Sequence, residues 1–513
     1  MSRRKQRRSV AAADIMDAQG PWFDGVAYLQ EKEPEEAFVS MAKSKTIGIL
    51  GGGMSGLMTA NLLDSVGIKD WTIVEASSRI GGRVHTSYLN GSTPDDYQYQ
   101  EMGPMRFPVS LTAENNETIE IMDHRMVFQL ADVLNQQNGN DSDYAVNFIK
   151  WIQSSPGNPS SSTLRRPDGT VPSRAEVAVD PAYSTNANAS YSNATLVAEA
   201  NEAIEEWSGL DEAGIRLLAS NVFQAHKKAV EEGYFDFSEA GYLKYQLGYD
   251  NNITDQVANI ASDSPEWLYD NVYFSASEWR TIDKGLSSLP AAFGPQVLNR
   301  TIFQTAVQGM TYNSSTEKVA IQHRSNNLFD ISPETMEFDY AVVAVPFSRV
   351  RLWNPLPDYT SLLSRAISRL NYQQSCKVAL HYESRFWEHL PEHPILGGCG
   401  SSNIPGVGSI CYPSYTLNAT GPGVILGSYV SGVQARSLGS LTEEQHVALI
   451  QRAMIEVHGP VAQDQWTGAY DRICWENNEF QSGAWAAPSV GQQDLYLPAY
   501  FHTEKHTVFG KYT

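Results

Sequence analysis

The chain contains 513 residues, of which 42% are hydrophobic and 19% charged, and it carries a formal net charge of −21. This composition is typical of a globular protein, and the length predicts more than one hydrophobic core. The acidic charge argues against a nucleic-acid partner, because nucleic-acid binding requires a basic face. No apolar stretch approaches the roughly 18 residues of a transmembrane helix, so we expect no membrane span.

Residues 1–42 are predicted to form a flexible N-terminal lead. The chain begins with the basic run MSRRKQRR, and no apolar segment follows it. A secretory signal peptide needs such an apolar segment. The sequence therefore leaves the location open, with the cytoplasm favoured over secretion.

A nucleotide-binding pattern follows this lead. The apolar run Thr46–Leu50 is predicted to be a buried strand, and it leads into the spacing G-x-G-x-x-G at Gly51, Gly53 and Gly56. Gly51 permits a tight turn, Gly53 lets a pyrophosphate approach the backbone, and Gly56 lets the following amphipathic helix pack against the strand. The N-terminus of that helix offers free N–H groups and a partial positive charge to the phosphates.

A second predicted strand, Trp71–Val74, ends at the acid Glu75. An acid at this point accepts hydrogen bonds from an adenosine ribose and disfavours the 2′-phosphate of NADP. Strand, glycines, helix, second strand and acid in this order are a stronger signal than the glycines alone. The run EASSRIGGR then places Arg79, Gly82 and Arg83 where they can reach the same pyrophosphate, an addition that nicotinamide-binding domains lack.

These motifs resemble the flavin-dependent amine oxidase superfamily, in which E-A-x-x-R-x-G-G-R after the ribose acid marks FAD. Within it, EMGPMRFP is similar to a segment of the L-amino-acid oxidases. The resemblance covers the chain from about Lys45 to its C-terminus. Its further segments are EMGPMRFP (101–108), IDKGLSSLPAAF (282–293), FDYAVVAVP (338–346), YQQSCKVAL (372–380), CYPSY (411–415) and WENNEFQSGAWAAP (475–488).

The resemblance implies an α/β fold in which a Rossmann-like FAD-binding domain is interwoven with a mixed-sheet substrate domain and inserted helices. We assign residues 43–108, 282–325 and 471–513 to the FAD-binding domain. Residues 109–281 would form the inserted helical region that controls substrate access. Residues 326–470 would form the substrate-binding mixed-sheet domain.

The resemblance also implies a site for non-covalent FAD, since no cysteine matches the position of a covalent flavin link. The expected FAD-binding residues are Gly51, Gly53, Met54, Ser55, Gly56, Glu75, Ala76, Arg79, Gly82, Arg83, Gly103, Pro104, Met105, Arg106 and Val307. In the family, the segment that matches Gly103 to Arg106 runs beneath the flavin. The backbone at the position of Val307 contacts the adenine.

Four residues are expected to carry the chemistry. Arg106 matches the arginine that holds the substrate carboxylate, because a guanidinium fits a carboxylate bidentately; pairing with Glu101 is the alternative. Tyr412 would be the second carboxylate partner, or else a core tyrosine. Lys377 resembles the lysine that contacts the flavin through a water, and is otherwise an ordinary strand lysine. Trp485 would form one wall of an aromatic slot, or simply a buried ring.

The four cysteines are expected to be buried free thiols. They show neither C-x-x-C spacing nor another metal-binding pattern, so we expect no metal site. They are Cys376, Cys399, Cys411 and Cys474.

These features predict an FAD-dependent L-amino-acid oxidase that acts as a homodimer on an L-amino acid and dioxygen, giving 2-oxo acid, ammonia and hydrogen peroxide. An amine or polyamine oxidase, or an amino-acid monooxygenase, stays open because no motif identifies the substrate side chain. A flavin-fold binding protein without activity is the third alternative. It stays open because Lys511 stands where the resemblance implies an acid, and the implied final helix does not follow before Thr513.

Overall fold

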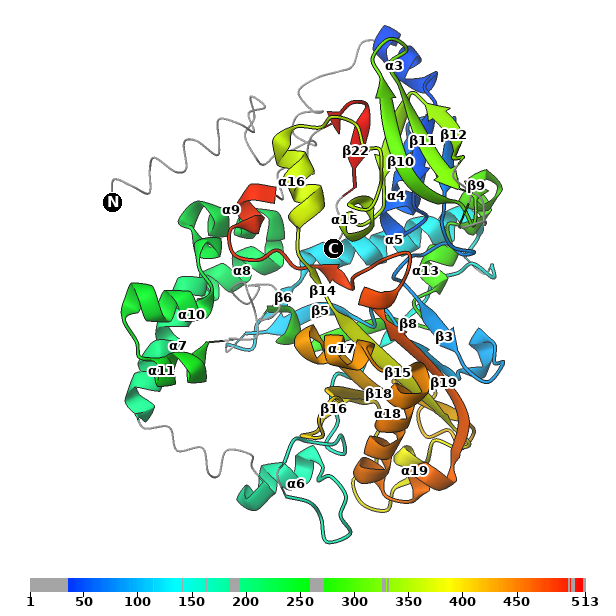
Figure 1. Cartoon of the computed structure of the whole chain (residues 1–513). Helices are drawn as coiled ribbons and strands as arrows, with labels where there is room; N and C mark the ends of the chain where they lie inside the picture. Colours follow the sequence, from blue (N-terminus) through cyan, green and yellow to red (C-terminus); the bar gives the residue numbers. More distant parts are fainter. Residues whose placement is uncertain are drawn as a thin grey trace.

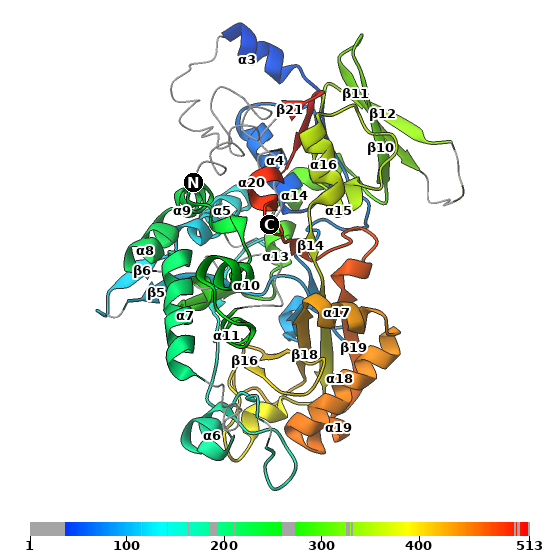
Figure 2. The same cartoon turned by 60° about the vertical axis from the view of Figure 1, so that its left-hand side comes forward.

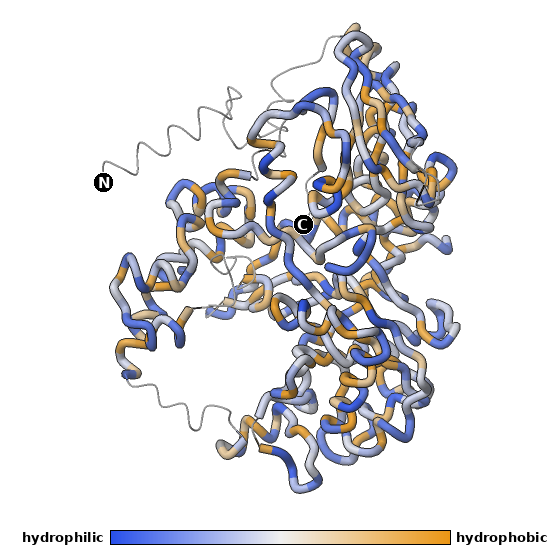
Figure 3. The backbone as a smooth tube through the Cα atoms, in the orientation of Figure 1, coloured by the Kyte–Doolittle hydropathy of each residue, from blue (hydrophilic) through white to orange (hydrophobic). Residues whose placement is uncertain are grey.

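The computed structural model describes residues 36–510, except residues 114, 141, 163, 184–192, 210, 259–271, 325–328, 330–331, 497–498 and 500–502. Two large sheets lie toward opposite ends of the folded molecule, and a cluster of helices lies to one side of them (Figures 1 and 2). The strands of both sheets carry many of the hydrophobic stretches (Figure 3). Lys511 lies outside the described residues.

The first large sheet has six strands in the order β21-β22-β13-β1-β2-β9. All neighbouring pairs are parallel except β21 and β22. Its strands are β1 (Ile47–Leu50), β2 (Trp71–Val74), β9 (Thr301–Ile302), β13 (Tyr340–Val343), β21 (Thr503–Glu504) and β22 (Thr507–Phe509). Helix α4 (Met54–Ser65) follows β1, as the sequence predicted. In such sheets, ligands bind beyond the carboxyl ends of the parallel strands.

The second large sheet is antiparallel, with the order β16-β17-β18-β15-β19. Alternate residues of β15, such as Val378 and Leu380, pack against Ile450 and Met454 of the covering helix α18. The strands are β15 (Ser375–Tyr382), β16 (Gly398–Ser401), β17 (Ser409–Tyr412), β18 (Gly423–Ser431) and β19 (Trp466–Cys474). The helices beside them are α17 (Gly432–Gly439), α18 (Glu443–His458) and α19 (Val461–Asp464).

Four smaller sheets connect and flank the large ones. One orders β6 (Thr118–Glu120), β5 (Phe107–Thr112), β8 (Glu278–Ile282) and β7 (Phe148–Lys150). Another orders β10 (Ala306–Asn313), β11 (Lys318–Arg324) and β12 (Glu334–Phe338). The pairs are β3 (Thr86–Tyr88) with β4 (Tyr99–Glu101), and β14 (Tyr372–Gln373) with β20 (Trp485–Ala486).

The remaining helices fall into two groups. Between residues 109 and 281 lie α5 (Met122–Asn138), α6 (Arg174–Val179), α7 (Ala194–Ser208), α8 (Glu212–Ser220), α9 (Val222–Glu232), α10 (Glu239–Gly241), the π-helix Tyr242–Leu247 and α11 (Asn251–Val257). Elsewhere lie α3 (Glu36–Lys43), α13 (Ser288–Ala291), α14 (Gly294–Val297), α15 (Phe347–Val350), α16 (Ser361–Arg369) and α20 (Gln492–Tyr496). None of the helices in the described ranges is both long and apolar enough to cross a bilayer.

The sheets show how closely the domains interweave. Strand β13 pairs with β1 in the six-stranded sheet, although residues 326–470 were expected to form the substrate-binding domain. Strand β19, which runs past residue 471, pairs with β15 in the five-stranded sheet. Helix α3 begins at Glu36, within the segment expected to be a flexible lead.

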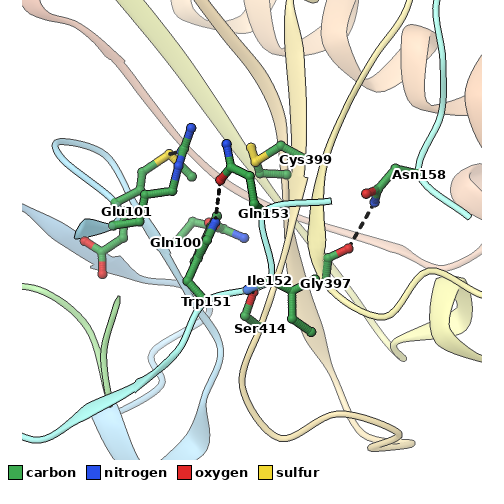
Figure 4. Close-up of a disulfide and its surroundings, with 12 residues drawn as sticks. Gln100, Glu101, Trp151, Ile152, Gln153, Asn158, Gly397, Cys399 and Ser414 are labelled. Atoms are coloured by element: carbon green, nitrogen blue, oxygen red, sulfur yellow. Dashed lines mark hydrogen bonds between the residues drawn. A yellow bond between two sulfur atoms is a disulfide. The ribbon is translucent and has the colours of Figure 1, made fainter. Parts of the chain in front are cut away.

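The cysteines are paired, so the prediction of free thiols is wrong. Cys376 bonds to Cys474 and Cys399 bonds to Cys411, and the two Cα atoms are 4.1 Å apart in each pair. Each pair joins residues that lie directly opposite in neighbouring antiparallel strands. Sequence spacing does not reveal such pairs, because only the register of the sheet places the two residues together. Figure 4 shows the surroundings of Cys399.

Candidate functional site

A cavity of about 1250 Å³ lies beyond the carboxyl ends of β1, β2 and β13. It exceeds the volume of most small-molecule pockets, which is about 300–1,000 Å³. Its wall includes Gly51, Glu75 and Ala344, which directly follow these three strands, and also Lys377 and Tyr429 of the five-stranded sheet. The cavity therefore extends from the parallel sheet to the antiparallel one.

The glycine turn brings the start of helix α4 to this cavity. Gly53, Met54 and Ser55 line the wall, and Gly53 caps the helix without any side-chain hydrogen bond. Gly56 faces the strand instead, where a Cβ atom would lie 2.0 Å from the carbonyl oxygen of Gly51. The first N–H groups of α4 thus face a space that suits an anion.

Glu75 is held rigidly at the cavity wall. One carboxylate oxygen accepts a hydrogen bond from the N–H of Gly52 at 2.7 Å. The other accepts from both the N–H and the hydroxyl of Ser77, each at 2.7 Å. The side chain is buried, yet its carboxylate oxygens keep lone pairs for further donors. This arrangement suits an acid that receives hydroxyl groups from a ligand.

A second glycine turn lies against the first. The N–H of Gly81 donates to the carbonyl oxygen of Gly52 at 2.8 Å, and Gly82 and Arg83 line the cavity. Arg83 donates to the carbonyl oxygen of Ala484 at 2.7 Å. The cavity is therefore bounded by two glycine turns and a cation.

Arg79 has a different place from the one expected. Its guanidinium donates to the carbonyl oxygens of Ile80, Gly82 and Val84, and it does not line the cavity. Those bonds hold the second glycine turn in shape. We therefore correct its role from direct pyrophosphate contact to support of the turn.

Lys377 extends from β15 into the cavity wall. Its Nζ donates to the backbone oxygens of Glu101 at 3.0 Å and Gly103 at 2.6 Å, and lies 4.8 Å from the ring centre of Tyr429. Burial lowers the pKa of Lys377 to about 7, against the opposing effect of the nearby Glu101 carboxylate. Burial also raises the pKa of Glu101 to about 7. Lys377 can therefore exchange a proton near neutral pH.

Two tryptophans bound the same part of the cavity. Trp485, the predicted aromatic wall, lies in β20 and lines the cavity. Trp475 lines it too, and its indole N–H donates to the carbonyl oxygen of Met102 at 2.9 Å. Gly103 and Pro104 complete this region of the wall. Trp475 opens the segment WENNEFQSGAWAAP, but no residue pattern there distinguished it as a site residue.

Arg106 lies beside the cavity instead of on its wall. Its guanidinium carbon is 5.4–5.6 Å from the ring centres of Trp151, Phe274 and Trp279. Burial lowers the pKa of Arg106 to about 10, and the cavity-lining Tyr429 has the opposite effect. Figure 4 shows Trp151 bonded to the amide of Gln153, a contact of 3.0 Å that orients one of these rings.

No carboxylate in the described ranges pairs with Arg106. Among the described residues its Nε atom is buried without a hydrogen-bond partner, and its guanidinium makes one long hydrogen bond, to the sulfur of Met105. The alternative partner Glu101 binds the hydroxyl of Thr86 and the N–H of Leu286 instead. A buried guanidinium without an acid is poised to receive an anionic ligand.

Two further expectations need correction. Tyr412 is fully buried on the helix side of the five-stranded sheet, where its hydroxyl contacts His458 at 2.9 Å. It does not line the cavity, whereas Tyr429 of the adjacent strand β18 does. Met105 also lies outside the cavity wall, buried in a cluster with Trp151 and Trp279. Side chains alternate along a strand, so a shift of one residue moves a side chain to the other face.

Comparison with known proteins identifies the family. The sequence profile described as flavin containing amine oxidoreductase matches residues 54–509. The chain belongs to this family of flavoenzymes.

Individual relatives of this flavin amine oxidoreductase include two bearing the name L-amino-acid oxidase. An L-amino-acid oxidase of Neurospora crassa is 42% identical over 509 residues, which cover 96% of this chain and 72% of that protein. A putative L-amino-acid oxidase of Bacillus subtilis is 26% identical, covering 88% of this chain and 86% of that protein.

Solved structures confirm the predicted fold. Putrescine oxidase bound to putrescine gives a TM-score of 0.58 at 16% identity, covering 91% of this chain and 92% of that one. Cyclohexylamine oxidase from Brevibacterium oxydans gives the same score and coverage at 14% identity. At these identities the similarity establishes the fold of the flavin amine oxidoreductase and nothing about its substrate.

The cavity of this flavin amine oxidoreductase fits an adenine dinucleotide. An uncapped helix N-terminus, a buried acid with spare lone pairs and two abutting glycine turns lie on one wall. Val307, expected beside the adenine, lines the same cavity, as does Ala76. In the ranges that the structure describes, no cluster of His, Cys, Asp or Glu suits a metal ion.

Proposed function

We propose that the chain is an FAD-dependent L-amino-acid oxidase. Its substrate would lose two electrons and two protons to form a 2-imino acid, which hydrolyses to the 2-oxo acid and ammonia. Dioxygen would take up the two electrons and two protons as hydrogen peroxide. The flavin supplies the two-electron acceptor when bound. The observation that carries the choice of substrate is the guanidinium of Arg106 beside the cavity, with which no acid in the described ranges pairs.

Arg106 supports an amino acid because simple amines have no carboxylate. A guanidinium buried among three rings is costly without an anion, and a bidentate carboxylate would satisfy its fork. Arg106 differs from an arginine with a purely structural role, since no acid in the described part of the chain neutralises its charge. Tyr429 lies near both this guanidinium and Lys377 and lines the cavity, so it can contact the bound substrate.

The cavity residues divide between the parts of the proposed FAD. Gly53, Met54 and Ser55 at the start of α4, with Gly82 and Arg83, would hold the diphosphate. Glu75 would accept the ribose hydroxyls, and Val307 would meet the adenine. Gly103, Pro104, Lys377, Trp475 and Trp485 would surround the isoalloxazine. All four cysteines are in disulfides, so none is left for a thioether to FAD, which supports non-covalent binding.

The disulfides also bear on location. Disulfides persist in oxidising compartments and are rare in the cytosol of most organisms. We infer that the protein folds in an oxidising environment, against the preference for the cytoplasm drawn from the N-terminus. Counting free thiols in protein from its native source, alkylated before lysis, tests this inference.

The test of the proposed function is peroxide release from a panel of L-amino acids, their D-enantiomers and the matching decarboxylated amines. We expect turnover of L-amino acids alone, because one carboxylate anchor and one flavin face together select one enantiomer. Equal rates with putrescine or benzylamine would favour the amine-oxidase alternative, to which the solved neighbours belong by name. A purified chain without oxidised-flavin absorbance would favour a binding protein.

A further inference from the structure

The disulfide Cys376–Cys474 lies directly behind the proposed flavin site. Cys376 precedes Lys377 in β15, and Cys474 precedes Trp475 at the end of β19. Both half-cystines are buried with Ala435 and other apolar residues beside helix α17. Because side chains alternate along β15, Lys377 points to the opposite face, where it lines the cavity.

Lys377 and Trp475, which follow the two half-cystines, both hydrogen-bond to the short segment 101–103. Lys377 donates to the carbonyl oxygens of Glu101 and Gly103, and Trp475 donates to that of Met102. Three consecutive carbonyl groups are thus held by residues adjacent to one disulfide. Met102 and Gly103 both line the cavity.

Residues 101–103 also have little room to move away from Lys377 and Trp475. A Cβ atom on Gly103 would lie 1.8 Å from the carbonyl oxygen of Arg83. The N–H groups of Met102 and Gly103 both donate to the carbonyl oxygen of His85. Residues 101–103 therefore lie between the second glycine turn on one side and Lys377 and Trp475 on the other.

The sheet topology indicates why the hydrogen bonds from Lys377 and Trp475 depend on a disulfide. Strand β15 is held on both sides, by β18 and β19, whereas β19 is an edge strand that pairs with β15 alone in its sheet. The pair Cys376 and Cys474 is the last register pair at the cavity end of the β15–β19 ladder. Beyond it the chain leaves the sheet into the short helix Trp475–Asn477. Strand ends fray readily where the ladder stops, and fraying here would withdraw Trp475.

We propose that the disulfide Cys376–Cys474 positions the cofactor site, by fixing the end of β19 on β15 so that Trp475 and Lys377 hold residues 101–103 against the cavity. The inference rests on the flavin assigned to this cavity and is independent of the choice of an amino acid as substrate. Neither cysteine touches the reacting atoms. They act through Lys377 and Trp475.

The chain offers a matched control in its second disulfide. Cys399–Cys411 also joins opposed residues of antiparallel strands, with the same Cα separation of 4.1 Å. None of its sequence neighbours lines the cavity. The double variant C399A/C411A therefore removes a cross-strand tie that is adjacent in sequence to neither Lys377 nor Trp475, although it packs in the apolar cluster that contains Met102.

The first measurement is peptide mapping of the purified holoenzyme without reduction, which should recover the Cys376–Cys474 pair. The second is FAD retention after gel filtration and the Kd for FAD. We expect C376A/C474A to weaken FAD binding by up to roughly ten-fold, the factor that corresponds to losing one hydrogen bond such as that of Trp475 to Met102. C399A/C411A should retain FAD as the wild type does.

A further variant separates positioning from general stability. W475F removes the indole bond to Met102 and keeps a ring in place. If the disulfide acts through Trp475, W475F weakens FAD binding clearly in the wild type and much less in C376A/C474A. Should C376A/C474A fail to fold, the same comparison is made on C399A/C411A with and without W475F, each treated with a phosphine reductant, because Cys376–Cys474 is then the disulfide left to reduce. The proposal would be overturned by additive losses of FAD affinity in W475F and C376A/C474A. Equal FAD loss in both double variants, or unchanged FAD binding in C376A/C474A, would overturn it too. A failed amino-acid assay would leave it intact.

Discussion

Lys377 and Glu101 are buried together, and the ammonium of Lys377 donates to the backbone oxygen of Glu101 at 3.0 Å. Burial disfavours the charged form of each side chain, so it lowers the pKa of the lysine and raises that of the acid, in both cases to about 7. Both side chains therefore change charge near pH 7.

This relationship predicts a pH dependence of flavin reoxidation by dioxygen. Lys377 is protonated below about pH 7 and neutral above it, so the rate should change across that pH. K377M should lack the transition. The charge of Glu101 raises the pKa of Lys377, so E101Q should move the transition to lower pH. Stopped-flow reoxidation across pH measures this, and a transition that persists in K377M would rule out Lys377 as its origin.

Arg106 should discriminate amino acids from amines. Losing one partner of a buried charge pair costs about 3–5 kcal/mol. R106A should therefore lower kcat/KM for the best L-amino acid by roughly two orders of magnitude or more. R106K should recover only part of this loss, because an ammonium cannot supply the planar fork. Rates with the matching amines serve as the control, and an equal loss with both substrates would contradict the carboxylate contact.

Glu75 should govern FAD retention. Hydrogen bonds to charged groups contribute about 1.5–3 kcal/mol, so E75A should weaken FAD binding by roughly ten- to a hundred-fold. S77A is the matched control, since it removes one donor to the carboxylate and leaves the acid in place. Flavin content after gel filtration measures both effects. Equal flavin content in E75A and wild type would remove Glu75 from the cofactor site.

Tyr412 should affect stability without affecting the reaction. Y412F removes the hydroxyl contact with the half-buried His458. The loss of such a bond lowers the free energy of unfolding by about 0.5–1.5 kcal/mol, which denaturant unfolding would detect. KM for the amino acid should stay unchanged, because Tyr412 lies on the helix side of the sheet. Y429F, which changes a cavity-lining tyrosine, should raise KM, and the reverse pattern would restore the original assignment.

The sequence alone predicted the nucleotide-binding end of the molecule well. Gly51, Gly56 and Glu75 belong to one strand–turn–helix–strand unit, and their contacts are with one another: Gly56 packs on Gly51, and Glu75 binds the N–H of Gly52. Such short-range geometry follows from residue type and spacing. The same applies to β1, α4 and β2, whose positions matched the predicted run of elements.

The pairing register of strands far apart in the sequence decided which other side chains line the cavity and which cysteines pair. Whether Tyr412 or Tyr429 faces the cavity depends on which side of the sheet each residue occupies, and a one-residue offset reverses that side. Cys376 meets Cys474 across 98 residues of sequence because β15 and β19 pair in one register. Trp475 reaches Met102 across 373 residues because the end of β19 lies against the segment that follows β4. The sequence by itself therefore determined the cofactor fold, because its motif is local. The tertiary structure alone decided which side chains complete the site, because their contacts depend on the pairing of distant strands.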